Sequence, residues 1–456
     1  MLDGGEHIMA AFEKFYFGSL DEFKGKIKEL NLNIPVSEDL SPLGDPVKVN
    51  NRTAPNSIAI LPMEGCDGEM DGSPSELTMR RYKRFAGGGA GLIWCEACAV
   101  TIEGRANPLQ LFLNKDNVEK FRELTEMCRK EAEEQNGYQP ILILQLTHSG
   151  RYARPFDNGA PMIAQHDPLL DPKVGITEAY PTITDSYLDR LQEKYIQAAL
   201  LAKEAGFDGV DIKACHRYLV SELLASYTRE GKYGGSFENR TRFLLGVIRK
   251  VRKAVGEDFI IASRFNVFDA HPYPYGFGVS RESEWIPDME EPLKLVKCMV
   301  EAGVDLISNS AGNPYYRFPQ VTRPFDAPII HGELPEEHPL ESVERLLEFT
   351  AKIQEAAGTI PVVGNGYSWM REYLPYVGAA EKKNGKCMFV GLGRQAFAYP
   401  DAARDILKQG KMLPQKCCIA CSKCTQIMRD HGKTGCVVRD SECYLPLYRE
   451  ARDGKS

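Results

Sequence analysis

Four cysteines near the C-terminus have the spacing of a metal-binding site. Two residues separate the first from the second and the second from the third, and eleven separate the third from the fourth; the four are Cys418, Cys421, Cys424 and Cys436. Closely spaced thiolates bind either a [4Fe–4S] cluster or a structural zinc ion. A chain of 456 residues has enough core to fold without a zinc clip. We therefore expect an iron–sulfur cluster, with zinc as the lesser alternative.

The remaining cysteines do not suggest a disulfide framework. Cys417 and Cys443 accompany the four, and seven more of the 13 are scattered through the chain. Met1 to Lys14 lacks the basic and apolar regions of a secretory signal, and no apolar run is long enough to span a bilayer. The net charge of −7 comes without a Lys/Arg-rich block, which argues against a nucleic-acid partner. We therefore expect a cytoplasmic protein with reduced thiols and neither a nucleic-acid nor a membrane partner.

Short apolar runs alternate with longer amphipathic stretches from Ile58 onward. The runs have the length and composition of buried parallel strands. Eight strands are predicted, at 58–63, 91–98, 141–146, 209–215, 259–265, 305–311, 360–366 and 387–393. Helices are predicted at 75–85, 118–134, 189–205, 239–254, 291–302, 340–357, 369–377 and 401–408. Three of these helices are followed by a glycine, as a helix C-cap requires: Gly206, Gly303 and Gly358.

Eight strand–helix units predict an α/β fold, a closed (β/α)8 TIM barrel. An open, doubly wound sheet is the alternative. It would carry a Gly-x-Gly-x-x-Gly turn after its first strand, whereas residues 62–68 are Pro-Met-Glu-Gly-Cys-Asp-Gly. We divide the chain into an N-terminal extension (1–50), the barrel (51–410) and a C-terminal cysteine-rich segment (411–456).

The chemistry of such a barrel belongs at the C-terminal ends of its strands. Glycines follow the seventh and eighth strands, where backbone N–H groups of these barrels bind phosphate. The candidate residues at the strand ends are Pro62, Met63, Glu64, Ala97, Gln145, Lys213, His216, Tyr218, Arg264, Gly364, Asn365, Gly366, Gly393 and Arg394. They do not form the cluster of carboxylates and histidines that a metal-dependent lyase would need.

Several segments occur in order on these elements: Asn51-Arg52, Pro62-Met63, Gln145 to Arg151, Gly206 to Ile212, Tyr218-Leu219, Tyr233 to Arg240, and Gly393-Arg394. Together they resemble the Old Yellow Enzyme family over roughly residues 45–443. The closer similarity is to its iron–sulfur branch, the 2,4-dienoyl-CoA reductase and trimethylamine dehydrogenase type.

The resemblance implies FMN in the mouth of the barrel. By position, Pro62, Met63 and Glu64 would lie beside the isoalloxazine ring. Ala97 and Gln145 would approach its pyrimidine edge. Arg264 would place a cation near N1 and O2, which stabilises the anionic reduced flavin. The residues expected at the phosphate are Gly364, Asn365, Gly366, Gly393 and Arg394.

The resemblance also implies an ene-reductase. Hydride would pass from flavin N5 to the β-carbon of an α,β-unsaturated carbonyl compound, and Tyr218, which aligns with the family's proton donor, would protonate the α-carbon. His216 lies where the family donates a hydrogen bond to the substrate carbonyl. Lys213 departs from the family's histidine. It would bind the carbonyl, a carboxylate or a thioester, or form a salt bridge at the barrel rim.

A second departure follows the sixth strand. Dienoyl-CoA reductases have a histidine shortly before an Arg-x-Pro, and it is missing from residues 313–319, Asn-Pro-Tyr-Tyr-Arg-Phe-Pro. The aromatic pair Tyr315 and Tyr316 suggests a flat apolar substrate instead.

The cysteine spacing is one residue shorter in its second gap than in the iron–sulfur branch. The flavin context still favours a [4Fe–4S] cluster that passes electrons to FMN. Because the chain ends at Ser456, without a domain for a second flavin, we expect electrons from NAD(P)H or from a separate donor protein. Two alternatives stay open: an amine dehydrogenase or demethylase of the same family, and a zinc-stapled flavin electron carrier without a substrate. A homo-oligomer is compatible with the sequence.

Overall fold

Eight parallel strands close into a barrel. The computed structural model describes residues 11–156, 158–316 and 319–454. Within these ranges the strands follow the order β10-β3-β4-β5-β6-β7-β8-β9 around the barrel. They are β3 Ile58–Ile60, β4 Leu92–Ala99, β5 Ile141–Thr147, β6 Gly209–Ile212, β7 Ile260–Phe268, β8 Leu306–Ala311, β9 Val362–Gly364 and β10 Phe389–Leu392. The predicted (β/α)8 barrel is confirmed.

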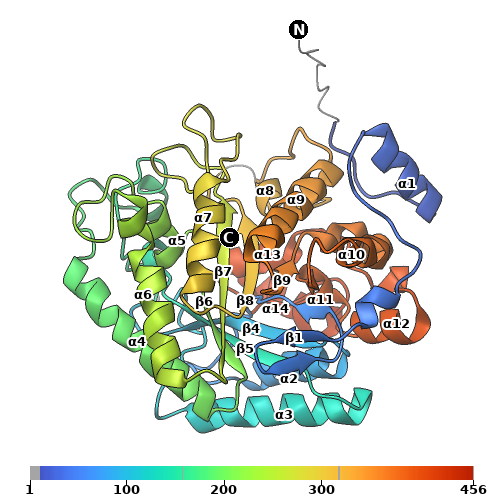
Figure 1. The fold of residues 1–456 in the computed structure, drawn as a ribbon, viewed down its shortest axis with the longest axis horizontal. Helices are drawn as coiled ribbons and strands as arrows, with labels where there is room; N and C mark the ends of the chain where they lie inside the picture. The colour runs from blue at the N-terminus through green and yellow to red at the C-terminus, as the bar shows by residue number, and fades with distance from the viewer. Residues whose placement is uncertain (1–10, 157, 317–318, 455–456) are drawn as a thin grey trace.

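Helices surround the barrel (Figure 1). Several begin at a side-chain cap, because the hydroxyl groups of Ser75, Thr184 and Ser236 accept hydrogen bonds from backbone N–H groups of the first turn. The outer helices are α2 Glu76–Gly87, α3 Val118–Asn136, α4 Asp185–Glu204, α6 Phe237–Val255, α7 Glu290–Glu301, α9 Pro339–Ala357, α10 Leu374–Lys383 and α12 Ala402–Gln409. Three short helices lie in loops that follow strands: α5 Leu219–Leu224, α8 Pro319–Thr322 and α11 Arg394–Ala398.

A hairpin closes the N-terminal end of the barrel. It is formed by β1 Val47–Val49 and β2 Arg52–Ala54, which pair antiparallel. Its apolar side chains pack with residues of the barrel interior such as Trp94 and Phe389. The hairpin spans the boundary that we placed between residues 50 and 51. Apolar side chains fill this end of the barrel, so a ligand site is expected at the other end, where the strands terminate.

The N-terminal helix α1 Leu20–Glu29 lies at the edge of the molecule, on the side of α10 (Figure 1). Phe23 of this helix stacks on Tyr373, with ring centroids 5.1 Å apart. Residues 1–10 of the predicted extension lie outside the described residues. No helix in the described part of the chain is both long and apolar enough to cross a membrane.

The C-terminal segment folds back onto the barrel. It contains α13 Lys423–Arg429 and α14 Ser441–Asp453. The backbone N–H of Thr434 donates to the carbonyl of Gly65, 2.6 Å away, in the loop that follows β3. Arg80 of α2 forms a salt bridge with Asp440 at 2.8 Å. These contacts hold the cysteine-rich segment beside the C-terminal ends of the strands.

Candidate active site

One cavity at the C-terminal ends of the strands brings together most of the residues identified from the sequence. It encloses about 1170 Å³ of empty space, including its open mouth. The candidate residues that line it are Pro62, Met63, Glu64, Gln145, Lys213, His216, Tyr218, Arg264, Tyr315, Asn365, Gly366, Gly393 and Arg394. We call it the inner cavity.

Three candidates lie outside the lining of the inner cavity. Ala97 is fully buried in β4, where it pairs with Gln145 of β5. Gly364 ends β9, and a β-carbon there would lie 2.9 Å from the hydroxyl of Tyr367. Tyr316 packs edge-on against His271, with centroids 4.4 Å apart. Of the aromatic pair, the structure therefore places Tyr315 at the cavity.

A buried aspartate orients Gln145. Asp211 of β6 accepts hydrogen bonds from Gln145 Nε2 at 2.6 Å, from Trp94 Nε1 at 2.9 Å and from the backbone N–H of Arg264 at 2.9 Å. Burial raises the pKa of Asp211 to about 6, although these donors act in the opposite direction. Because Nε2 of Gln145 is engaged with Asp211, its Oε1 is left as the acceptor for a group in the cavity.

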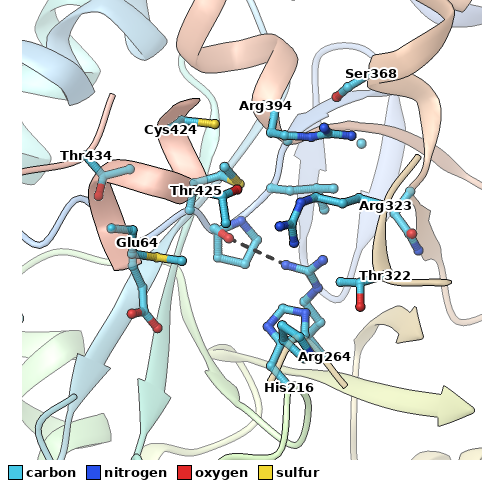
Figure 2. Close-up of a pocket in the computed structure, with 18 of the residues that line it drawn as sticks. Glu64, His216, Arg264, Thr322, Arg323, Ser368, Arg394, Cys424, Thr425 and Thr434 are labelled. Carbon is cyan, nitrogen blue, oxygen red and sulfur yellow. Dashed lines mark hydrogen bonds between the residues drawn. The ribbon is translucent and has the colours of Figure 1, made fainter. Parts of the chain in front are cut away.

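Three guanidinium groups enter the inner cavity from different elements (Figure 2). Arg264 belongs to β7, Arg323 follows α8, and Arg394 begins α11. Arg264 donates to the carbonyl of Pro62 at 3.5 Å, and Arg394 donates to that of Pro324 at 2.6 Å. Each of the three arginines still has a buried nitrogen that finds no partner among the described residues: Nε of Arg264, Nε of Arg323 and Nη1 of Arg394.

Arg323 and Arg394 lie close enough to repel each other, and neither forms an ion pair with a carboxylate of the described residues. Burial and the charge of Arg394 lower the pKa of Arg323 to about 9. Cations withdrawn from water without a carboxylate partner are costly. A phosphate between them would satisfy both the charge and the unpartnered nitrogens. The residues present therefore fit a phosphate-bearing cofactor.

Arg323 was not identified from the sequence. It lies in the loop after β8, and its place at the C-terminal end of a barrel strand is the only signal that could have revealed it. The cysteine-rich segment was likewise not expected to form part of the cavity wall. The lining residues missed from the sequence include Arg323, Ser368, Thr425, Met428, Arg429 and Thr434.

Glu64, Lys213 and Tyr218 contact one another in the wall of the cavity. The hydroxyl of Tyr218 donates to the carboxylate of Glu64, whose oxygens are 3.1 and 3.2 Å away. Lys213 forms a salt bridge with Glu64 at 3.0 Å, and its Nζ lies 3.9 Å from the centroid of the Tyr218 ring. Burial and the charge of Glu64 raise the pKa of Tyr218 well above 10, so the phenol is protonated at neutral pH.

A strained turn holds His216 at the cavity. His216 and Arg217 have φ angles of +62° and +58°, in the left-handed region that favours glycine. Arg217 is fully buried and forms salt bridges with Asp167 at 3.2 Å and Asp269 at 3.4 Å, which anchor the turn. His216 Nε2 lies 2.9 Å from the hydroxyl of Ser310. Burial and the charge of Arg264 lower the pKa of His216 well below 6.5, so its imidazole is neutral.

The four cysteines line a second, smaller pocket beside the inner cavity. Cys418, Cys421, Cys424 and Cys436 all lie in its wall, and Cys424 and Arg394 belong to both cavities. All thirteen cysteines are free thiols. Among the described residues, no three His, Cys, Asp or Glu side chains lie close enough to hold one metal ion.

Backbone groups support these thiols. The N–H of Ala420 donates to Cys418 Sγ at 3.4 Å, and the N–H of Arg439 donates to Cys436 Sγ at 3.3 Å. The N–H of Cys418 donates to the side chain of Gln395, which follows Arg394 in α11. Burial raises the pKa of Cys418 to about 12. A bound metal would be needed to keep such a thiol ionised at neutral pH.

Residues 42–323 match the sequence model of the NADH:flavin oxidoreductase / NADH oxidase family. The chain belongs to this family. The match covers most of the barrel and confirms the predicted FMN-dependent oxidoreductase class. It does not distinguish the iron–sulfur branch of the family from the others.

Individual relatives agree with this assignment. The chain is 29% identical over 380 residues to an NADH oxidase of Thermoanaerobacter brockii, covering 82% of this chain and 52% of that protein. Its fold is similar to that of 2-naphthoyl-CoA reductase, solved with 2-naphthoyl-CoA, at a TM-score of 0.69 and 19% identity over 91% of this chain and 59% of the other. An old yellow enzyme homologue from Zymomonas mobilis gives a TM-score of 0.59 and 21% identity over 82% of this chain and 94% of the other. The chain thus spans little more than half the length of the first two proteins.

Proposed function

We propose that this protein is an FMN-dependent ene-reductase. The observation that carries the proposal is the inner cavity, which combines unpartnered guanidinium nitrogens at one side with Tyr218 and His216 at another. When bound there, FMN supplies the hydride for a C=C bond conjugated to a carbonyl group. Arg323 and Arg394 would hold its phosphate, together with backbone groups of Asn365, Gly366 and Gly393.

Two further residues would orient the flavin ring. Gln145 would accept a hydrogen bond from the ring through Oε1, because Asp211 already engages its Nε2. Arg264 would place its charge at the pyrimidine side of the ring, which favours the anionic reduced form. Pro62 and Met63 would supply apolar contact to the ring.

Tyr218 and His216 would act on the substrate. The neutral imidazole of His216 would donate a hydrogen bond to the carbonyl oxygen, where negative charge develops during reduction. The protonated phenol of Tyr218 would deliver a proton to the α-carbon. Tyr315 stacks on Tyr152 with centroids 3.6 Å apart, which holds the Tyr315 ring in the cavity wall, and an aromatic ring there suits a planar unsaturated substrate.

We also propose that Cys418, Cys421, Cys424 and Cys436 bind a [4Fe–4S] cluster, with segment 411–456 as the cluster-binding unit and the preceding barrel as the flavin-binding unit. A tetrahedral zinc site brings four sulfurs to within roughly 4 Å of one another, whereas a cluster binds each thiolate to a different iron. The flavin-family barrel beside this pocket favours the cluster, because zinc has no redox chemistry and could pass no electrons to a flavin. Such a group supplies single electrons to a neighbouring flavin. NAD(P)H or a separate donor protein would provide them, and the reduced thiols suit a cytoplasmic location.

Two measurements test these proposals. An anaerobic visible spectrum with FMN, iron, sulfide and zinc assays should show flavin bands together with broad iron–sulfur absorption. Zinc without iron would reject the cluster, and a protein purified gently without flavin would reject the ene-reductase. Turnover of a panel of enones and enoyl thioesters should then fall by on the order of a hundredfold or more in Tyr218→Phe. The matched control Tyr195→Phe removes a buried hydroxyl that has no partner among the described residues and does not line the cavity, so it should leave turnover unchanged.

A further inference from the structure

Glu64 lies at the junction of two cavities. A second space, the outer cavity, holds about 1010 Å³ of empty volume including its mouth and is bordered by the exposed residues Lys173 and His431. The two cavities share Glu64, Tyr218, Tyr315, Met428 and Arg429. Water can therefore reach Glu64 from the outer cavity while a flavin and a substrate fill the inner one.

The contacts of Glu64 connect this entry to the proton donor. Its carboxylate accepts one hydrogen bond from the hydroxyl of Tyr218 and another from Lys213 Nζ, 3.0 Å away. The side chains of Glu64 and Lys213 are only 14% and 4% exposed, so the contact between them is shielded from bulk solvent. Glu64, which borders both cavities, thus connects the Tyr218 hydroxyl to the outer cavity, while Lys213 lines the inner cavity and holds the Glu64 carboxylate.

The charge of Glu64 creates a difficulty for the proposed chemistry. When Tyr218 gives its proton away, a phenolate is left about 3 Å from a carboxylate in a poorly hydrated wall, and like charges so close strongly disfavour one another. The transfer is completed only if a proton arrives at this pair. The charge of Lys213 compensates for one negative group and not for two.

We propose that Glu64, assisted by Lys213, is the relay that returns a proton to Tyr218 from water in the outer cavity. This inference rests on the proposed ene-reductase function. With FMN bound and reduced, the flavin would supply a hydride to the β-carbon, and Tyr218 Oη–H would give its proton to the α-carbon. Water in the outer cavity gives a proton to Glu64, which passes it to Tyr218 Oη, and the hydroxide left behind is neutralised by the buffer; Lys213 keeps its charge and holds the carboxylate in place. The substrate gains one hydride and one proton, and the protein returns to its starting protonation.

Other titratable groups around the relay bear on its pH dependence. Tyr315 contacts Tyr218 from the loop after β8, and Cys66 approaches from the loop after β3. The titratable groups that interact electrostatically with Glu64, Lys213 or Tyr218 are Cys66, Glu96, Cys215, His216 and Tyr315. The charges of Asp67, Asp211, Arg264 and Arg429 act on these neighbours in turn. Burial raises the pKa of Glu96 to about 7, so a titration near neutral pH must be assigned with a Glu96→Gln variant alongside.

The relay is tested in Glu64→Gln by comparing the rate of the first turnover with the steady-state kcat. The glutamine keeps an acceptor for the Tyr218 hydroxyl but does not shuttle a proton. FMN-loaded enzyme is reduced anaerobically and mixed with an enone. The first turnover uses the proton already on Tyr218, so its rate should stay within about threefold of the wild-type rate. Steady-state kcat should fall by about tenfold or more at high pH, and a small buffer acid should restore part of it.

The control and the contrary outcomes are well defined. The hydroxyl of Tyr187 donates a similar hydrogen bond to Glu103, and neither residue lines either cavity. Glu103→Gln therefore serves as the control and should change neither rate. Parallel losses in both rates would mean that Glu64 only positions Tyr218, and unchanged rates in both would mean that it has no role; either result overturns the relay. Absence of enone turnover by the wild type would instead reject the ene-reductase. In the flavin-free protein, ¹³C NMR of labelled tyrosine should show that Glu64→Gln lowers the pKa of Tyr218; an unchanged pKa would also overturn the relay.

Discussion

Replacing Asp211 by asparagine should turn the Gln145 amide around. Asp211 now accepts from three donors, and an asparagine keeps only one oxygen. We expect this oxygen to face the backbone N–H of Arg264, which cannot rotate, so that the NH2 group faces Gln145 Nε2 and Trp94 Nε1. Gln145 relieves its own conflict by rotating its amide, which brings Nε2 to the cavity in place of Oε1. The indole N–H of Trp94 has no such alternative and loses its partner.

Two separate losses follow, each of about 1–3 kcal/mol, the cost of one unsatisfied buried donor. The unsatisfied indole N–H of Trp94 lowers the free energy of unfolding by that amount. The rotated Gln145 faces a ring N–H with another donor, which raises the Kd for FMN by about 5-fold to 150-fold. Fluorescence titration of the flavin-free protein measures the Kd. It should be done at about pH 7.5, above the pKa of about 6 of Asp211, where the wild-type carboxylate is charged.

A double-mutant cycle with Gln145→Ala provides the control. If Asp211 acts on FMN through Gln145, the two substitutions are not additive, and the double variant binds FMN about as weakly as the weaker single variant. Additive losses would show that Asp211 affects FMN by another route. A Kd for FMN that is unchanged in Asp211→Asn would refute the assigned orientation of Gln145.

Three further predictions concern stability and cofactor content. Glu381 is buried with one oxygen that has no partner among the described residues, and burial raises its pKa to about 7 from an unfolded value of 4.5. Its ionisation therefore destabilises the folded chain fully above pH 7 and not at all below pH 4.5. Glu381→Gln should raise the free energy of unfolding, measured by urea denaturation, by about 3 kcal/mol at about pH 8 and hardly at all at about pH 4. Arg217→Ala leaves Asp167 and Asp269 buried without their cation and should lower the free energy of unfolding by about 3–5 kcal/mol. Arg217→Gly should lower it by about 1 kcal/mol less, because glycine accepts the positive φ. Equal losses of stability in thermal unfolding would show that the turn is unstrained. Cys424→Ser should lower the iron and sulfide content in metal analysis, and an unchanged iron content would exclude Cys424 as a ligand.

The barrel was predictable because its signal is local. Parallel strands buried on both faces are continuous apolar runs, so the strand predicted at 91–98 appears as β4 Leu92–Ala99 and the one at 141–146 as β5 Ile141–Thr147. Once the eight strands are assigned, the barrel geometry brings their C-terminal ends together. Residues as distant as Glu64 and Tyr218 could therefore be assigned to one site without knowledge of their contacts.

The remainder of the site depends on contacts between distant segments. The salt bridge of Lys213 with Glu64 joins residues 149 positions apart, and the sequence alone left both a substrate contact and a salt bridge open for Lys213. Arg323 lies in a loop whose path is set by tertiary packing. Thr425 and Thr434 reach the inner cavity because the cysteine-rich segment folds back onto the barrel, which no local pattern predicts.

If the proposed cluster binds at the four cysteines, the wall that α13 contributes to the inner cavity would link the loading of the two cofactor sites. Cys424 faces both pockets, and the residues that follow it cover part of the inner cavity. A chain whose cysteines are empty would leave that cover less firmly held, so FMN would bind more weakly. Thermodynamic reciprocity requires that bound FMN strengthen retention of the cysteine-held group by the same factor. Assembly of the two sites would then be cooperative, and oxidative damage to the thiols would release the flavin as well.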